Sequence, residues 1–253
     1  MKYIAIAETD VGIAKDTNQD SILIKHADSQ VGELVLAVVC DGMGGLAKGE
    51  LASATVIREF SRWFDEELPF ELTNLDFQII QAKWTLMIKD LNALILDYGH
   101  TNGVSLGTTF TGMLIINDQY LIGHVGDTRA YYISSLVKQL TLDQTFVARE
   151  IQRGTLTLEQ AKMDKRRNML LQCVGASEQV EPSMMIGKCE KGVYMLCSDG
   201  FRHEISEEEI YEKFNSTKLK DANTMHMNAR YLIEKNKERQ EKDNISVVLI
   251  KSC

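Results

Sequence analysis

The sequence predicts an α+β fold in which helices pack on antiparallel β-sheets. Short segments rich in Ile, Val and Leu, bounded by polar residues or glycine, are typical of strands. Longer segments with apolar residues at helical spacing are typical of helices that cover a sheet. Because strands and helices come in separate runs, this arrangement is favoured over a doubly wound fold. No linker composition divides the 253 residues, so we expect a single domain over residues 1–253.

The N-terminal part is predicted to contain strands over residues 3–7, 21–25 and 34–39, which begin an antiparallel arrangement. Two long helices are predicted to follow, over residues 48–67 and about 74–98, and to cover one face of a sheet. The apolar residues that recur at helical spacing are Leu51, Ala54, Phe60 and Phe64 in the first helix and Ile79, Ile80, Trp84, Met87, Leu91 and Leu94 in the second.

The remaining segments are predicted in the same way. Strands over residues 108–116, 119–125 and 130–133 are expected to form a meander, with Asn117 and Asp118 in a tight turn between the first two. Two short helices broken near Gly154, and a charged stretch at 164–167, indicate an exposed flap around residues 143–180. Strands are predicted over 183–188, 192–197 and 245–250, and helices over about 207–214 and 222–237.

The composition limits the class of protein. With 44% hydrophobic and 25% charged residues it is that of an ordinary globular chain, and a net charge of −8 argues against a nucleic-acid partner. Charges interrupt every hydrophobic run, so no membrane span is expected. The opening residues also lack the features of a signal peptide. Five cysteines without CxxC spacing fit a reducing compartment, so we expect a cytoplasmic protein.

Four aspartates each adjoin an apolar segment at its end: Asp41, Asp127, Asp199 and Asp243. A carboxylate at the rim of a packed sheet is held in place while its oxygens face solvent, which suits Mg²⁺ or Mn²⁺. Taken singly, each is better explained as a turn or capping residue, because Asp-Gly is a common turn pair. Together, the four favour a metal site.

Six short motifs occur in order along nearly the whole chain. They are KDTNQDS around Asp20, DGMGG from Asp41, GTT from Gly107, GDTRAY from Gly126, SDG from Ser198 and DN at Asp243. In order and approximate spacing they resemble the bacterial metal-dependent protein phosphatases of the type 2C family. Residues 140–161, LTLDQTFVAREIQRGTLTLEQA, are similar to the flap segment of that family.

The resemblance implies two antiparallel β-sheets packed as a central sandwich, with helices on both outer faces and a flap subdomain. It implies a serine/threonine protein phosphatase that hydrolyses phosphoserine and phosphothreonine by attack of a water activated at a binuclear Mn²⁺ or Mg²⁺ centre. Such a protein would act as a monomer on phosphorylated proteins and oppose a serine/threonine kinase.

The resemblance also implies roles for individual residues. Asp41 would bridge two metal ions, and Asp199 and Asp243 would complete one of them. The Gly42 carbonyl would help to hold the other ion, and Asp127, with Asp199, would hold a third, weaker one. A further residue, Asp20, would order metal-bound water.

Three departures from the family pattern concern the substrate. Lys15 stands where the family usually places an arginine that binds the phosphate, and a phosphate contact and a solvated surface lysine are both open. Met43 stands where eukaryotic members carry a histidine, which leaves the general acid unassigned. Asp164 and Lys165 replace the His-Pro pair often found in the flap.

Other polar residues are interpreted structurally. His124 is predicted to be a packed, hydrogen-bonded core histidine, and Arg129 a partner for nearby carboxylates. Thr108 and Thr109 are expected to support the metal ligands through hydrogen bonds. His203 is left open between a cleft and a surface position.

Two other functions remain as alternatives. The chain could be a pseudo-phosphatase that binds phosphoproteins, against which the intact set of aspartates argues. It could instead be a two-metal phosphohydrolase that acts on small phosphate esters. Metal-dependent turnover and substrate preference separate these alternatives from the main prediction.

Overall fold

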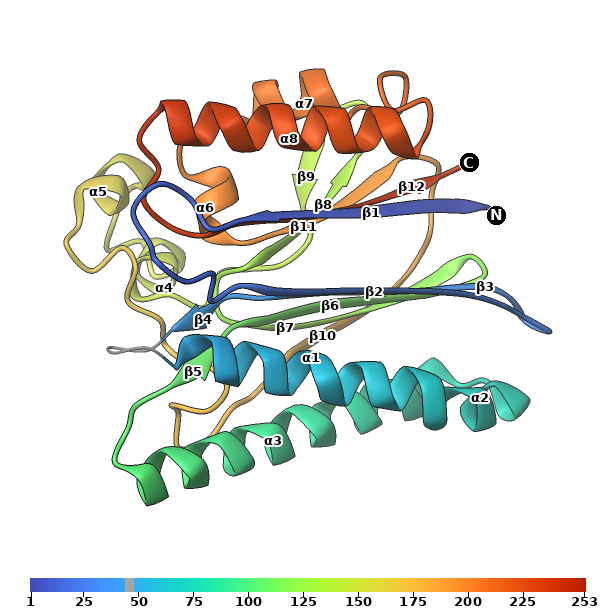
Figure 1. Cartoon of the computed structure of the whole chain (residues 1–253), viewed down its shortest axis with the longest axis horizontal. Coiled ribbons are helices and arrows are strands. Elements are labelled where there is room, and N and C mark those ends of the chain that lie inside the picture. The colour runs from blue at the N-terminus through green and yellow to red at the C-terminus, as the bar shows by residue number, and fades with distance from the viewer. Residues whose placement is uncertain (44–47) are drawn as a thin grey trace.

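Two antiparallel β-sheets lie face to face in the computed structural model, which describes residues 1–43 and 48–253 (Figure 1). Helices cover the outer face of each sheet, so the layers run helix, sheet, sheet, helix. The predicted central sandwich with helices on both outer faces is confirmed. Residues 44–47, which include the last two glycines of the DGMGG motif, lie outside the described residues.

The first sheet has the strand order β1-β12-β11-β8-β9, and all neighbours are antiparallel. Its strands are β1 (Tyr3–Asp10), β8 (Arg129–Ile133), β9 (Val137–Gln139), β11 (Val193–Cys197) and β12 (Ile245–Ser252). The first and last strands of the chain therefore lie side by side, and both termini are at the same end of the molecule (Figure 1).

The second sheet has the order β10-β7-β6-β3-β2, again antiparallel throughout. Its strands are β2 (Ser21–Ser29), β3 (Gly32–Cys40), β6 (Phe110–Ile116), β7 (Gln119–Val125) and β10 (Ser183–Lys188). A short pair, β4 (Gly42–Met43) and β5 (Gly107–Thr108), continues from β3 and into β6.

Two predicted strand pairings are wrong. The antiparallel start holds for β2 and β3, but β1 pairs with β12 in the other sheet. The predicted meander ends after β7, because β8 joins the first sheet beside β11. The short connection between β7 and β8 contains Gly126 at φ 103, and this left-handed residue lets the chain cross between sheets where a hairpin would have kept it in one. The predicted hairpin turn is confirmed, with Asn117 at φ 57.

The helices segregate by sheet. Helices α1 (Gly49–Glu66) and α3 (Phe77–Asn102) cover the second sheet, and α7 (Glu207–Phe214) and α8 (Ala222–Glu238) cover the first (Figure 1). The short elements are α2 (Leu68–Glu71), the 3₁₀ helix η1 (Leu72–Asn74), α4 (Phe146–Gln152), α5 (Leu158–Met163) and α6 (Asp199–Arg202). Among the described helices, none is long and apolar enough to cross a membrane.

Local signals set the bounds of the longest helix, α3. The Asp76 side chain accepts a hydrogen bond of 2.8 Å from the Gln78 N–H and so caps its start. Gly103 ends it in the left-handed conformation at φ 63. The buried face includes Ile80, Trp84 and Leu91 at helical spacing.

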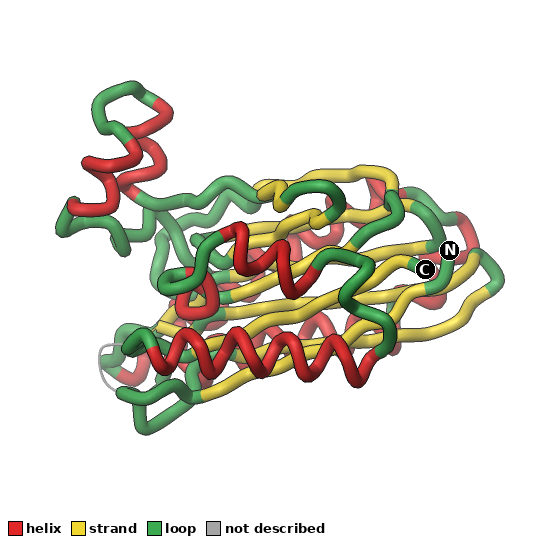
Figure 2. Tube along the Cα trace, turned by 90° about the horizontal axis from the view of Figure 1, so that it is seen from above, coloured by secondary structure: helices red, strands yellow, loops and turns green. Residues whose placement is uncertain are grey.

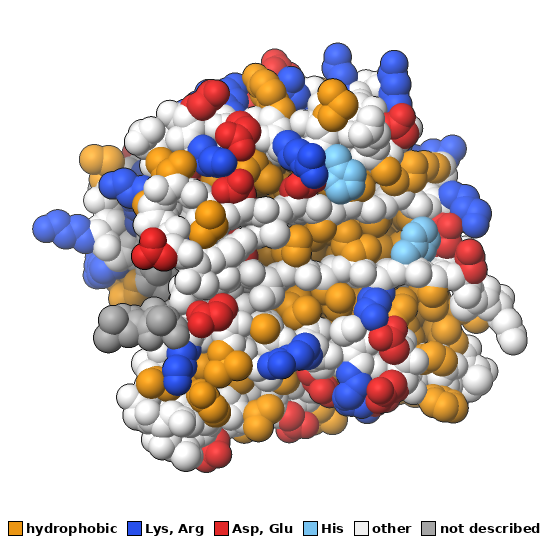
Figure 3. Space-filling view, in the orientation of Figure 1, with side chains coloured by type: hydrophobic (Ala, Val, Ile, Leu, Met, Phe, Trp, Pro, Cys, Tyr) orange, Lys and Arg blue, Asp and Glu red, His pale blue; other side chains and the backbone are white. Residues whose placement is uncertain are grey.

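Three apolar clusters fill the spaces between the layers. Almost all residues of strand β3 are buried, because the strand is covered on both faces. Leu36 and Val38 face the helices of the second sheet, whereas Val35 and Ala37 face the first sheet. Apolar side chains remain visible along the open edge between the sheets (Figure 3).

Candidate metal centre

The aspartates singled out in the sequence all come from strand ends at one end of the sandwich. Asp41 follows β3, Asp127 comes two residues after β7, and Asp199 comes two residues after β11. Asp20 and Asp243 come just before β2 and β12. Because the end of one antiparallel strand lies beside the start of its neighbour, these residues gather at the same edge (Figure 1).

The strand registers make this convergence specific. Ser21 pairs with Cys40, so Asp20 and Asp41 are next to each other at the edge of the second sheet. In the first sheet, the Ser198 N–H donates a hydrogen bond of 3.1 Å to the Ser246 carbonyl. The segments around Asp199 and Asp243 are therefore adjacent.

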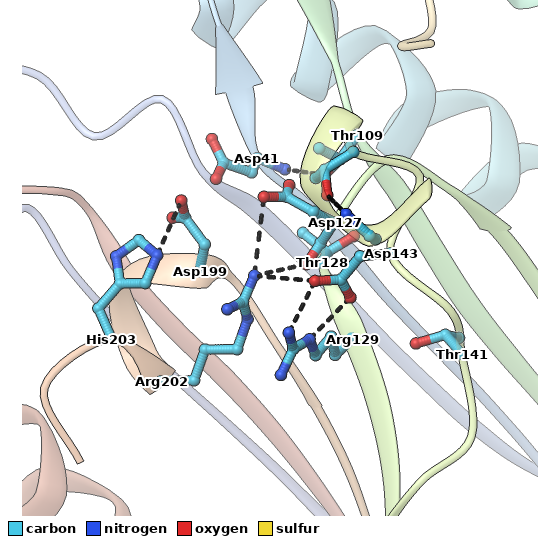
Figure 4. Close-up of polar contacts among 12 residues, drawn as sticks. Asp41, Thr109, Asp127, Thr128, Arg129, Thr141, Asp143, Asp199, Arg202 and His203 are labelled. Carbon is cyan, nitrogen blue, oxygen red and sulfur yellow. Dashed lines mark hydrogen bonds and ion pairs between the residues drawn. The ribbon is translucent and has the colours of Figure 1, made fainter. Parts of the chain in front are cut away.

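The backbone of Asp41 is held by two threonines. Its N–H donates to the Thr109 hydroxyl at 2.9 Å, and its carbonyl accepts from the Thr109 N–H and the Thr108 hydroxyl, both at 2.9 Å. The hydrogen-bonding role expected of these threonines is confirmed. The Asp41 carboxylate points away from them, on the side of Asp199 (Figure 4).

Two glycines are required by close backbone contacts at the site. A Cβ on Gly42 would lie 2.4 Å from the Gly49 carbonyl oxygen and 2.5 Å from that of Gln19. A Cβ on Gly200 would lie 2.2 Å from the Asn244 carbonyl oxygen. Only glycine allows these chain segments to approach so closely, which explains the glycine after Asp41 and after Asp199.

The carboxylates disfavour one another's ionisation. Burial raises the pKa of Asp41 well above its ordinary value, and the charges of Asp20, Asp199 and Asp127 raise it further. Burial likewise raises the pKa of Asp20 to about 7, with added effects of Asp199 and Asp243. Burial and the charge of Asp199 raise the pKa of Asp127 to about 7. Added positive charge would relieve this repulsion.

The cluster is looser than a closed metal cage. Within residues 1–43 and 48–253, no three His, Cys, Asp or Glu side chains stand in an arrangement that could already hold a metal ion. The aspartates are close enough to raise each other's pKa, but coordination would require their side chains to turn inward on backbones that are already placed.

Comparison with known proteins decides the family. The family model described as "Protein phosphatase 2C" matches residues 13–231, which contain all but one of the clustered aspartates. The chain belongs to the protein phosphatase 2C family. Its membership agrees with the sandwich fold and with the carboxylates at one end of it.

Named relatives are bacterial members of the family. The chain is 29% identical over 247 residues to the serine/threonine protein phosphatase PstP of Mycobacterium tuberculosis, covering 96% of this chain and 44% of PstP. It thus spans less than half the length of that relative. It is 28% identical over 249 residues to the serine/threonine phosphatase Stp of Listeria monocytogenes, covering 96% of this chain and 93% of Stp.

One similar solved structure contains manganese ions. The catalytic domain of PstP in complex with two manganese ions superimposes with a TM-score of 0.79 at 28% identity, covering 98% of this chain and 97% of that one. A relative with the same fold as this chain therefore binds two Mn²⁺ ions.

The donor set of this 2C-family chain fits divalent cations. Both carboxylate oxygens of Asp20 and Oδ1 of Asp199 are buried and have no hydrogen-bond partner among the described residues. Buried carboxylate oxygens are costly unless a donor or a cation satisfies them. The cluster offers only oxygen ligands, and these are the ligands that Mg²⁺ and Mn²⁺ prefer.

The loop that carries Lys15 and Asp20 is tied to β12 by a residue that the sequence did not single out for this role. The Asn244 side chain donates to the carbonyls of Val11 at 2.9 Å and Thr17 at 3.2 Å, and it accepts from the Gln19 N–H at 2.9 Å. This places Lys15 at the rim of the cluster, where its Nζ lies 3.1 Å from Asp243 Oδ1.

The sequence also missed two charged residues beside Asp127. Arg202 lies on α6, and its Nη2 is 3.6 Å from Asp127 Oδ2 and 3.7 Å from Asp143 Oδ2. Asp143 is bound through two hydrogen bonds of 2.7 Å by Arg129, as predicted for a structural arginine (Figure 4). Burial would raise the pKa of Asp143, but the bonds from Arg129 and the charge of Arg202 lower it.

His203 faces the cluster and is partly exposed. Its Nε2 lies 3.6 Å from Asp199 Oδ2, and its Nδ1 lies 3.3 Å from Glu241 Oε2. His203 is thus exposed and at the same time lies beside Asp199, so both features left open by the sequence are present. Burial would lower the pKa of His203, but the contact with Glu241 and the charge of Asp199 raise it above its ordinary value.

The flap is fastened at its base next to Asp127. The Gln144 N–H donates a hydrogen bond of 2.8 Å to the Gly126 carbonyl, and the Leu171 N–H donates one of 2.7 Å to the Gln144 carbonyl. Helices α4 and α5 stand away from the sheets (Figure 2). Where His-Pro is frequent in the family, Asp164 instead binds Arg166 at 2.8 Å, and the Arg166 guanidinium lies 4.0 Å from the centre of the Phe146 ring.

His124 is a core histidine, as predicted. Its Nε2 lies 3.0 Å from the Leu142 carbonyl, which can only accept, so Nδ1 accepts from the Thr111 hydroxyl at 2.9 Å. Burial lowers its pKa to about 4. The unfolded chain therefore binds a proton between about pH 6.5 and 4 that the folded protein does not bind.

We expect this difference to reduce the free energy of unfolding by about 3 kcal/mol as the pH falls from 6.5 to 4. Urea unfolding of the metal-free protein and of His124→Gln across this range measures the effect, because other groups cancel in the comparison. The variant should lose less stability on acidification. Parallel pH curves would contradict the neutral, buried state of His124.

Proposed function

We propose that this protein is a serine/threonine protein phosphatase that uses Mn²⁺ or Mg²⁺ held at the carboxylate cluster. The observation that carries the proposal is the gathering of five aspartates from both sheets at one end of a 2C-family fold. The named relatives PstP and Stp are serine/threonine phosphatases, and they support the choice of substrate.

The proposed ligands are those that the resemblance to the family implies. Asp41 follows β3 and would bridge two cations, with Asp199 and Asp243 on one and the Gly42 carbonyl on the other. Asp20 is buried behind Asp41, and its unpartnered oxygens would accept hydrogen bonds from water bound at the centre. Asp127, beyond Asp41, would contribute to a third position together with Asp199.

The residues of this chain prepare the site for a phosphate ester. The Thr108 and Thr109 hydrogen bonds hold the Asp41 backbone, so only the side chain has to turn when a ligand arrives. When bound, divalent cations lower the pKa of water toward neutrality and offset the charge of the substrate phosphate. Lys15 is placed at the rim by its loop and would meet the phosphate as a point charge without the two-pronged geometry of arginine.

Hydrolysis of p-nitrophenyl phosphate and of phosphothreonine peptides tests the proposal. We expect turnover with Mn²⁺ that chelation by EDTA abolishes and that renewed Mn²⁺ restores, because the carboxylates alone offer no activated nucleophile. Peptides carrying phosphoserine or phosphothreonine should be better substrates than small phosphate metabolites. Absence of metal-dependent turnover would contradict the function in favour of a binding role, and a preference for small metabolites would contradict the substrate class.

The cellular setting is part of the same proposal. The substrates are phosphorylated proteins, and the enzyme opposes a serine/threonine kinase in the cytoplasm as a monomer. Five free cysteines, four of them buried, support a reducing compartment. Residues 1–253 form one catalytic domain, with the segment around residues 143–180 as its flap.

A further inference from the structure

Arg202 occupies the space next to Asp127. It follows Asp199 by three residues on α6, and one helical turn therefore brings both side chains to the same face. Its side chain is only 13% exposed, and its Nη2 donates a hydrogen bond of 3.1 Å to the Asp127 carbonyl. The same nitrogen lies 3.6 Å from Asp127 Oδ2, and the guanidinium points between Asp127 and Asp143 (Figure 4).

Arg202 lies near both aspartates, but only Asp127 receives a hydrogen bond from it, through the backbone carbonyl. Asp143 receives two bonds of 2.7 Å from Arg129 and one of 3.2 Å from the Gln139 side chain. Arg202 Nη2 lies 3.7 Å from Asp143 Oδ2 and 3.6 Å from Asp127 Oδ2, so neither carboxylate accepts a hydrogen bond from it. The two arginines and the two aspartates form a group without net charge.

A divalent cation held by Asp127 and Asp199 would lie close to this guanidinium. Like charges at such distances inside a protein repel strongly, because little water screens them. Arg202 cannot relieve the repulsion by losing its proton, since a guanidinium stays charged in proteins. Any cation at this position would have to displace Arg202 or bind against the repulsion of its positive charge.

We propose that Arg202 supplies a built-in positive charge at the third cation position and thereby lowers the affinity of that position for a divalent cation in this chain. The inference rests on the proposed function, because it presupposes the two-cation centre. Arg202 binds the Asp127 backbone carbonyl and keeps its positive charge 3.6 Å from the Asp127 carboxylate.

Counting bound Mn²⁺ by electron paramagnetic resonance, in which free Mn²⁺ gives the signal, tests the proposal without use of activity. The wild-type chain should bind two Mn²⁺ ions before the free signal rises. Arg202→Gln should bind a third, with an affinity for that ion raised on the order of tenfold, because one unit of positive charge is removed nearby. Arg202→Lys keeps the charge and should resemble the wild type.

Two further variants control the count. Asp127→Asn combined with Arg202→Gln should lose the additional ion, because it removes the carboxylate that the third cation needs. Arg58→Gln removes an equal charge from the exposed face of α1 and should leave the count at two. Thermal unfolding of each variant shows that it is folded before the titration.

The outcomes separate this inference from the proposed function. A wild-type chain that binds no Mn²⁺ would overturn the two-cation centre itself. Two ions in the wild type with an unchanged count and affinity in Arg202→Gln would overturn only the role of Arg202. Three ions of equal affinity in the wild type would do the same, and this result does not depend on any variant folding.

Discussion

Asp41→Asn is expected to lower the kcat for Mn²⁺-dependent hydrolysis of p-nitrophenyl phosphate on the order of a thousandfold or more. Asp41 is the one carboxylate that would touch both cations, so its loss would weaken the whole centre. Asparagine keeps the shape of the side chain, and the hydrogen bonds to Thr108 and Thr109 use only the Asp41 backbone and are retained. Initial rates at saturating Mn²⁺ measure the effect.

A second readout distinguishes a lost ligand from a damaged fold. Burial and neighbouring carboxylates raise the pKa of Asp41, so its ionised form destabilises the metal-free protein. Asp41→Asn should therefore unfold at a higher temperature than the wild type in EDTA, and it should gain less from added Mn²⁺. Asp90→Asn on the exposed face of α3 is the matched control and should change neither quantity. Wild-type turnover in Asp41→Asn would contradict the site.

Trp84→Ala is expected to lower the free energy of unfolding by about 3–5 kcal/mol, the usual range for removing a large aromatic side chain from a core. Trp84 is fully buried, with ring centres 5.1 Å from Phe60, 5.6 Å from Trp63 and 6.1 Å from Phe110. The cavity would open between α3 and the second sheet. Urea unfolding of the metal-free proteins measures the change.

The identity of the neighbours explains why this site cannot collapse. Gly112 and Gly123 lie under the indole, where a Cβ would come within 3.2 Å and 3.1 Å of its ring atoms. Glycines have no side chain to fill the space that alanine would leave. Trp84→Phe should cost less than the alanine variant, and Leu86→Ala, at a position 60% exposed on the same helix, should have little effect. Equal losses for Trp84→Ala and Leu86→Ala would be incompatible with this packing.

Element positions were predictable because they depend on local patterns. The helix α7 and the strands β7 and β10 have the predicted bounds, and the other predicted elements differ by a few residues at their ends. The short elements α2, η1, β9 and α6 were not predicted. Single positions were less secure. Ile79 and Leu94 were counted in the apolar stripe of α3, but they are 56% and 60% exposed, since a long apolar helix leaves some large residues outside its contact face.

The pairing of strands was less predictable than their positions. β1 and β8 are apolar segments that fit either sheet, and nothing local distinguishes a hairpin partner from one far along the chain. The partner of β1 is β12, at the other end of the sequence, and that choice depends on closing the whole first sheet.

The residues of the site also fall into those that the sequence indicated and those that it did not. Aspartates after apolar strands stood out because a carboxylate at a strand end has a recognisable context. Arg202, Asp143 and Asn244 had no such signal, since each acts through a partner distant in sequence. Arg129 was the exception, because its place two residues after Asp127 suggested a carboxylate partner.

The sequence by itself determined the class of fold, the places of most helices and strands, and the aspartates that belong together, because periodicity and strand-end chemistry are local properties. Only the tertiary structure decided which strands meet, that Lys15 faces Asp243, and that Arg202 lies against Asp127. The physical reason is that charges interact through space. Their partners are set by the packing of two sheets, which no single segment of the chain specifies.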